Sequence, residues 1–242
     1  MTEERRIELE IPLEASPDEV WDAITTRAGL TAWFAPMDVA PDEHGNSTDG
    51  IVTRWEPGKG YAVHTSPGED GSTTSYEYLI EARDGGTAVL RFTQTGFYGD
   101  DWESEYEATA RGWGLYFHTL VQYLTFFPRR PAIYIEAAGP DASSTPEAWK
   151  QLRAALGLID APVALGKEIR LEVPGLAPVV GVLDHNGPSH LGIRTDEALL
   201  RFHGRHLLGM SVALGHYYYG DHQNQAQLQE AWQSWLTTLY TA

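Results

Sequence analysis

Four strand-like segments separated by tight-turn residues, and then one long amphipathic helix, constrain the fold of this chain most. Runs of apolar and β-branched residues predict strands at 51–56, 60–65, 73–82 and 87–95. Gly58, the segment 67–71 and the glycines that follow Asp84 predict the turns between these strands. Because such turns join strands that run in opposite directions, the pattern predicts an antiparallel meander.

The segments on either side of the meander complete the first half of the chain. Ile7 to Leu13 alternate between apolar and other residues, which predicts a half-buried strand, and Ser16-Pro17 is typical of a helix start. After the meander, a helix is expected to begin near Asp100 and to end at Pro128. Its apolar positions form one face: Tyr106, Trp113, Tyr116, Phe117, Leu120, Leu124 and Phe127.

The second half resembles a shorter pass over the same plan. Residues 97–100 (FYGD) and 218–221 (YYGD) each precede the last helix of their half, and aromatic and leucine positions recur at matching spacing in both helices. A period above 100 residues favours tandem domains, here 1–130 and 131–242. Strands are predicted at 167–173, 178–184, 190–194, 198–203 and 207–218, and a final helix at 223–240. The run 217–219 (YYY) straddles both faces of its strand, so at most two of these rings are expected in a core.

Charge and cysteine content exclude several classes of protein. The formal net charge is -17, and residues 1–130 carry 10 basic and 23 acidic side chains. Such an acidic chain repels phosphate backbones and anionic lipid surfaces, so no nucleic-acid partner is expected. The chain has no cysteine, which excludes disulfides and thiolate chemistry. Without a signal peptide or an apolar stretch of about 20 residues, a cytoplasmic protein that does not insert into membranes is expected.

Motifs of the first half resemble a known family. They are Val20-Trp21-Asp22-Ala23-Ile24-Thr25 after the capped start, Trp33-Phe34, and Gly112-Trp113 in the long helix. Together and in this order they are similar to the SRPBCC superfamily, also called START-like or helix-grip, in the branch named for the activator of heat-shock protein 90 ATPase. The resemblance covers residues 5–127. A glycine-rich step that many members carry after the WF pair is absent, and the acidic loop 38–50 stands in its place.

The resemblance implies an α+β helix-grip fold, in which a curved antiparallel sheet surrounds a long C-terminal helix, here in two tandem copies. It also implies a cavity between sheet and helix that holds an apolar or amphipathic small molecule. The candidate ligand-binding residues are Trp33, Phe34, Trp55, Tyr76, Tyr78, Phe92, Gly112, Trp113, Tyr116 and Phe117. A solid aromatic core is the alternative interpretation of the same residues.

Catalysis is not assumed. His118 lies beside the apolar face of the helix and is the only weak catalytic candidate, because no partner carboxylate is evident in the sequence. No metal site and no cofactor are expected, since phosphate-binding glycine motifs and helical His spacings are absent. The leading hypothesis is therefore a small-molecule binding protein. The alternatives are a cyclase- or hydrolase-like enzyme acting on a cyclic or aromatic metabolite, and a cochaperone-like module with a protein partner or a homodimer.

Overall fold

The alternating residues at the start of the chain form β1 (Arg6–Leu13), and the capped segment after them forms α1 (Pro17–Thr25) and α2 (Arg27–Thr31). The computed structural model describes residues 6–47, 50–66, 73–96, 102–158, 163–220 and 224–241. Ser16 and Glu19 form a reciprocal capping box at the start of α1: the Glu19 amide donates to the Ser16 hydroxyl, and the Ser16 amide donates to the Glu19 carboxylate. This box satisfies two helix-end amides that would otherwise lack partners.

The predicted meander is confirmed. It consists of β3 (Gly50–Glu56), β4 (Gly60–His64), β5 (Ser75–Ala82) and β6 (Ala88–Thr95), with a two-residue strand β2 (Asn46–Ser47) in the segment expected to be a loop. The sheet order is β1-β6-β5-β4-β3-β2, and every neighbouring pair is antiparallel. The last strand of the meander therefore pairs back with the first strand of the chain.

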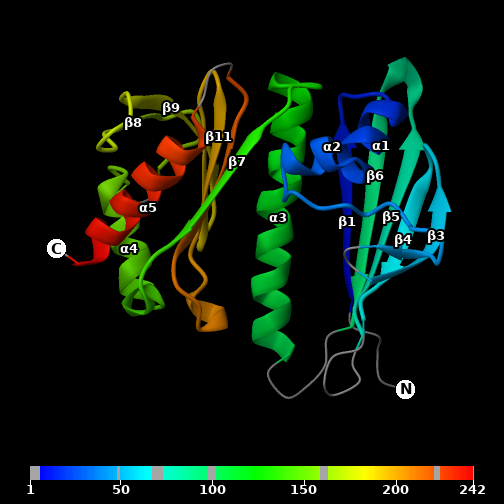
Figure 1. Cartoon of the computed structure of the whole chain (residues 1–242), viewed down its shortest axis with the longest axis horizontal. Coiled ribbons are helices and arrows are strands. Elements are labelled where there is room, and N and C mark those ends of the chain that lie inside the picture. Colours follow the sequence, from blue (N-terminus) through cyan, green and yellow to red (C-terminus); the bar gives the residue numbers. More distant parts are fainter. Residues whose placement is uncertain are drawn as a thin grey trace. The chain divides into compact units, whose positions relative to one another are not determined.

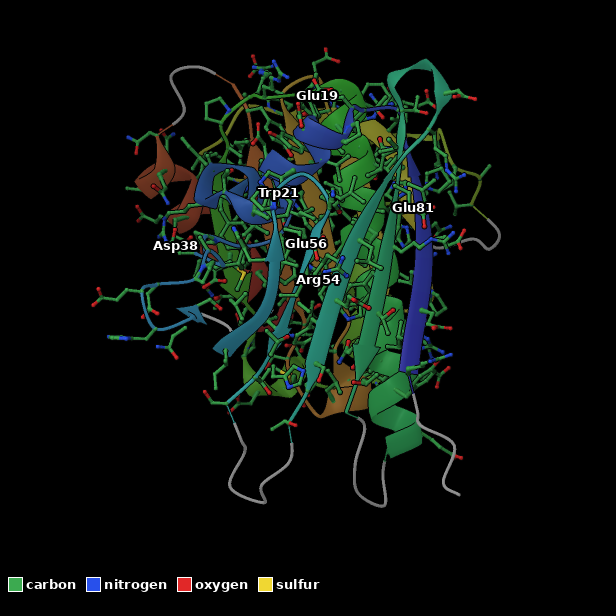
Figure 2. The ribbon with its side chains drawn as sticks, turned by 90° about the vertical axis from the view of Figure 1, so that its right-hand side faces the viewer. Glu19, Trp21, Asp38, Arg54, Glu56 and Glu81 are labelled. Carbon is green, nitrogen blue, oxygen red and sulfur yellow. The ribbon has the colours of Figure 1, made fainter. Side chains whose placement is uncertain are left out.

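The two faces of this sheet differ in chemistry. One face is apolar and buried, as at Ile11 and Leu90. The opposite face carries ion pairs, and Figure 2 shows Arg54, Glu56 and Glu81 on it. Arg54 pairs with Glu56 at 2.9 Å, and Arg91 pairs with Glu81 at 2.6 Å. Because these pairs are exposed to solvent, each contributes little to stability.

The long helix α3 spans Trp102–Phe126 (Figure 1). The capping role expected of Asp100 lies outside the described residues. The chain divides into two units: Met1–Ala110 with Thr119–Pro131, and Arg111–His118 with Ala132–Ala242. The domain division at 130/131 stays a prediction.

The second unit contains another six-stranded antiparallel sheet. Its strands are β7 (Ile133–Ala138), β8 (Glu168–Leu171), β9 (Val179–Asn186), β10 (His190–Arg194), β11 (Ala198–His203) and β12 (Ala213–Tyr218), in the order β7-β12-β11-β10-β9-β8. Two helices accompany it: α4 (Pro146–Ala155), which Thr145 caps, and α5 (Gln225–Thr241) (Figure 1). Phe202, Leu214, Trp232 and Leu236 belong to one buried core, which places α5 on one face of this sheet.

One predicted strand is partly wrong. Residues 213–218 form β12, but the segment before it contains a short 3-10 turn, His206–Leu208, and Gly209 has a φ of +64°. A residue with positive φ breaks the extended pattern that apolar content alone suggests. The two sheets nevertheless share one order of strands, each followed by a helix, so the fold is α+β with two helix-grip copies.

Candidate functional site

Aromatic side chains form a continuous row across the first sheet. The strand register places Trp55, Tyr61, Tyr78 and Phe92 opposite one another on β3 to β6. Successive ring centroids are 5.7, 4.6 and 5.0 Å apart, and Tyr76 lies 6.3 Å from Phe92. Tyr61, Tyr78 and Phe92 are buried, whereas Trp55 and Tyr76 are partly exposed. The face thus combines three buried rings with two that remain accessible.

Trp33 and Phe34 lie next to α2, with ring centroids 5.5 Å apart. Trp33 is 1% exposed, and its indole Nε1–H donates to the carbonyl of Ala23 at 2.9 Å. This contact ties the segment after α2 to α1. For Trp33 the described contacts therefore fit packing, the alternative that the sequence left open.

The predicted residues on α3 are Gly112 and the rings of Trp113, Tyr116 and Phe117, and a second glycine, Gly114, follows Trp113. Trp113 stacks on Phe117 at 5.3 Å and lies 6.0 Å from Tyr116. A Cβ built at Gly112 or at Gly114 would meet no atom within 4 Å. Close packing therefore does not explain these glycines, although each weakens a helix interior.

Three pockets in the described part of the chain are candidate binding sites. The pocket of the first unit, about 520 Å³, lies between α1, α2 and the end of α3 and includes Glu19, Asp22, Tyr123 and Arg129. In the second unit, one pocket of about 460 Å³ includes Tyr116, and another of about 450 Å³ lies beside Leu228. Of the residues predicted to bind a ligand, Tyr116 alone lines one of these three pockets.

The second unit places a carboxylate beside the one catalytic candidate. Asp184 Oδ2 lies 3.6 Å from His118 Nε2, just beyond hydrogen-bond distance. Arg201 donates two hydrogen bonds, of 3.0 and 2.9 Å, to the same carboxylate. The side chains of Arg201 and Asp184 are 1% and 5% exposed. Burial would raise the pKa of Asp184, but the charges of Arg201 and His118 outweigh it, so this pKa is lowered and the carboxylate is ionised at neutral pH.

Four histidines of the second unit are largely removed from solvent, and one of them, His216, accepts a hydrogen bond at Nδ1 from the Arg201 backbone amide. Burial lowers the pKa of His185 and of His190 to about 4, and that of His216 to about 3. Burial also lowers the pKa of His203 well below 6.5. All four imidazoles are therefore neutral at pH 7, where each offers one donor and one acceptor.

Sequence reasoning missed Asp184 and Arg201 as a pair, although one local signal existed. Gly192 lies in the middle of β10, and a Cβ there would overlap Asp184 Oδ1 and approach Arg201 Nη1 within 2.7 Å. Glycine inside a strand often marks such a close approach. A glycine at this position indicates that a neighbouring side chain packs against the strand there, but it does not identify which residue does so.

No group of three or more His, Cys, Asp or Glu side chains is arranged to hold a metal ion in the described part of the chain. Among the helices of the same residues, none has the length and apolar content to cross a membrane.

Residues 14–125 match the model of a family described as Activator of Hsp90 ATPase homolog 1-like protein. This segment contains every motif that carried the resemblance, from Val20 to Trp113. None of the curated proteins matches the chain.

Three solved structures illustrate the structural similarity. Protein MLL2253 from Mesorhizobium loti is 22% identical over 50% of this chain and 97% of its own, with a TM-score of 0.43. The di-domain ARO/CYC protein BexL of the BE-7585A biosynthetic pathway is 13% identical over 98% and 99%, with a TM-score of 0.43. The Aha1 dimer from Colwellia psychrerythraea is 21% identical over 50% and 96%, with a TM-score of 0.39. At these TM-scores the similarities carry no argument about function.

Proposed function

We propose that this chain, whose residues 14–125 belong to the SRPBCC superfamily in its activator-of-Hsp90-ATPase branch, binds an apolar or amphipathic small molecule. The ligand would lie against the apolar face of the sheet of the first unit. The observation that carries the proposal is the aromatic row, because adjoining rings, with Trp55 and Tyr76 accessible on the same face, are a surface that an apolar molecule can cover.

The accessible ring of Trp55 offers a direct test. Its indole lies 5.0 Å from Trp21 and 5.7 Å from Tyr61, whereas the neighbouring Arg54 pairs with Glu56 and Glu77. Alternation along β3 places Trp55 and Arg54 on opposite faces of the sheet. Trp55→Ala therefore changes the proposed binding face, and Arg54→Ala changes the other face of the same strand.

Nile red, a neutral dye that fluoresces in apolar surroundings, is a suitable probe. The wild type should bind it saturably. Trp55→Ala should weaken binding about tenfold, since a lost aromatic contact and its buried area are together worth 1–2 kcal/mol, as an order of magnitude. Arg54→Ala should leave binding unchanged. Equal affinities for all three proteins, with their folds verified by circular dichroism, would contradict the proposal.

An enzyme is the second candidate, and the His118–Asp184–Arg201 arrangement favours it. Asp184 is fixed by Arg201, and a fixed carboxylate next to a histidine orients the ring for proton transfer. His118 would act as the general acid or base toward a cyclic or aromatic metabolite.

The enzyme hypothesis makes a different prediction for the bound molecule. If His118 transfers a proton during turnover, His118→Gln protein should retain unreacted substrate. Native mass spectrometry should then show bound molecules of different mass in His118→Gln and in wild type. The same bound mass in both proteins would support binding without catalysis.

A further inference from the structure

The second unit carries a pocket of about 460 Å³ that is separate from the aromatic row of the first unit. Its lining includes Tyr134 and Glu136 of β7, Gly215 of β12, and His203 at the end of β11. The neighbouring residues Ile135, Phe202 and Leu214 belong to the core under α5. Since successive residues of a strand point to opposite faces, these polar lining residues lie on the face away from that core.

Small residues form the floor of this pocket. Gly215 is flanked across the sheet by Glu136 and Arg201, and Ala213 by Ala138 and His203. A Cβ at Gly215 would lie 3.3 Å from the Tyr134 hydroxyl and 3.7 Å from His203 Nε2. Tyr134 and His203 therefore pack directly against the backbone of Gly215, and a larger residue there would displace them.

Three side chains with rings line the pocket. Tyr116 lies 5.8 Å from His203, measured between ring centroids, and Tyr134 lies over Gly215. Burial raises the pKa of both Tyr116 and Tyr134, so both phenols are neutral at pH 7. Rings of this kind favour a flat aromatic ligand, whose faces and edges they can contact.

Arg205 supplies the charge. Its Nε donates to the carbonyl of Ser211 at 2.9 Å, which holds the guanidinium in place. In the described part of the chain, its two terminal amino groups have no hydrogen-bond partner. A planar guanidinium fixed in this way is suited to a carboxylate, which it can bind with two parallel hydrogen bonds. Glu136 at the rim is exposed, and the Tyr134 hydroxyl donates to it at 3.3 Å, so its opposing charge is screened by water.

We propose that the pocket of Tyr116, Tyr134, His203, Arg205 and Gly215 is a second binding site, which takes a small aromatic molecule bearing a carboxylate group. The rings of Tyr116, Tyr134 and His203 contact the aromatic part, and Arg205 pairs with the carboxylate. Neither the site nor its ligand class depends on the apolar site of the first unit.

The test compares two probes that share one ring system. Naphthoate carries the carboxylate, and naphthalenemethanol, substituted at the same ring position, is its neutral counterpart. Isothermal titration calorimetry of the full chain should give a dissociation constant of about 1 mM or tighter for naphthoate, as expected for a ligand of this size. Naphthalenemethanol should bind more weakly.

Three variants separate the contributions. Arg205→Gln should weaken naphthoate binding about tenfold and leave naphthalenemethanol binding within about twofold. Glu136→Gln should strengthen naphthoate binding, because it removes the opposing charge. Gly215→Val should abolish binding of both probes by displacing the rings of Tyr134 and His203, and the strand substitution Ala62→Val on β4 of the first unit serves as its control.

Four results would overturn the proposal. The first is that wild type shows no saturable naphthoate binding at about 5 mM, and the second is that folded Gly215→Val binds the probes as wild type does. The third is that Arg205→Gln weakens the binding of both probes equally, and the fourth is that Trp55→Ala loses naphthoate binding. The last would assign the binding to the first unit. If Gly215→Val does not fold, Arg205→Gln and Glu136→Gln decide through their opposite effects on naphthoate.

Discussion

At the scale of single residues, the buried Asp184–Arg201 pair is the feature that local sequence patterns could not predict. Seventeen positions separate the two residues, and their contact depends on the pairing of β9, β10 and β11. A charged residue in a strand is usually predicted to face solvent, as Arg54 and Glu56 do here. Every residue of β11 is buried, so side chains are buried on both faces of this strand. The alternation of residue types in the sequence therefore cannot show that Arg201 is buried.

Removing one partner of this pair should be costly. Asp184→Asn keeps the shape but leaves the charge of Arg201 buried without its counterion, and such changes destabilise proteins by about 3–5 kcal/mol. Urea denaturation at pH 7 should show this loss in the free energy of unfolding. The double variant Asp184→Asn/Arg201→Met should be more stable than Asp184→Asn alone, because it removes the unpaired charge. A single variant as stable as wild type would show that the pair is not buried in solution.

The buried histidines predict a dependence of stability on pH. Their folded-state pKa values, about 4 for His185 and His190 and about 3 for His216, lie below the ordinary value of 6.5. The unfolded chain therefore binds more protons than the folded chain between these values. The contribution of the neutral rings is complete above pH 6.5 and is lost as the pH falls from 6.5 toward 4. Asp184 does not contribute in this window, since its lowered pKa keeps it ionised.

The measurement is the free energy of unfolding, determined by urea denaturation at several pH values between 7 and 4. It should fall steadily below pH 6.5, because a tenfold difference in proton affinity between the folded and unfolded chain is worth about 1.4 kcal/mol. His190→Gln removes one titrating group, so its pH dependence should be shallower than that of wild type. A flat profile between pH 7 and 5 for wild type would contradict the prediction.

At the scale of elements, helix starts and hairpins were predictable because their signals are local. The Ser16 cap and the strand β10 (His190–Arg194) lie where the sequence predicts them. The expectation that at most two of Tyr217, Tyr218 and Tyr219 are in a core is wrong, because all three are buried at 1%, 8% and 3% exposure. Both faces of the second sheet bury side chains, and alternation in one strand cannot reveal what covers the second face.

The glycines of α3 give a prediction for the helix as an element. Gly114→Ala should increase the free energy of unfolding by about 0.5–1 kcal/mol, since alanine favours the helix and its Cβ would meet no atom within 4 Å. Gly29→Ala in α2 is the matched control and should destabilise, because its Cβ would overlap the carbonyl oxygen of Asp22. Thermal denaturation of both variants provides the comparison. Destabilisation by Gly114→Ala would mean that α3 packs more tightly there than the structure shows.

At the scale of the whole molecule, the repeat accounts for the length of the chain. In each half the first strand pairs with the last strand of its sheet, and a helix with proline in its first turn follows the first strand. The sequence predicted this plan from short matches, because the order of elements survives when individual residues change. It did not predict the polar site of the second unit, since that site joins residues from α3, β9 and β11.

The central claim is that the first unit holds an apolar or amphipathic small molecule, and native mass spectrometry of the purified chain tests it most directly. We expect a species heavier than the 26.8 kDa chain, which returns to the mass of the bare chain on denaturation. Trp55→Ala should carry less of the bound molecule than Arg54→Ala does. Only the bare mass in all three proteins, even after incubation with Nile red, would contradict the claim.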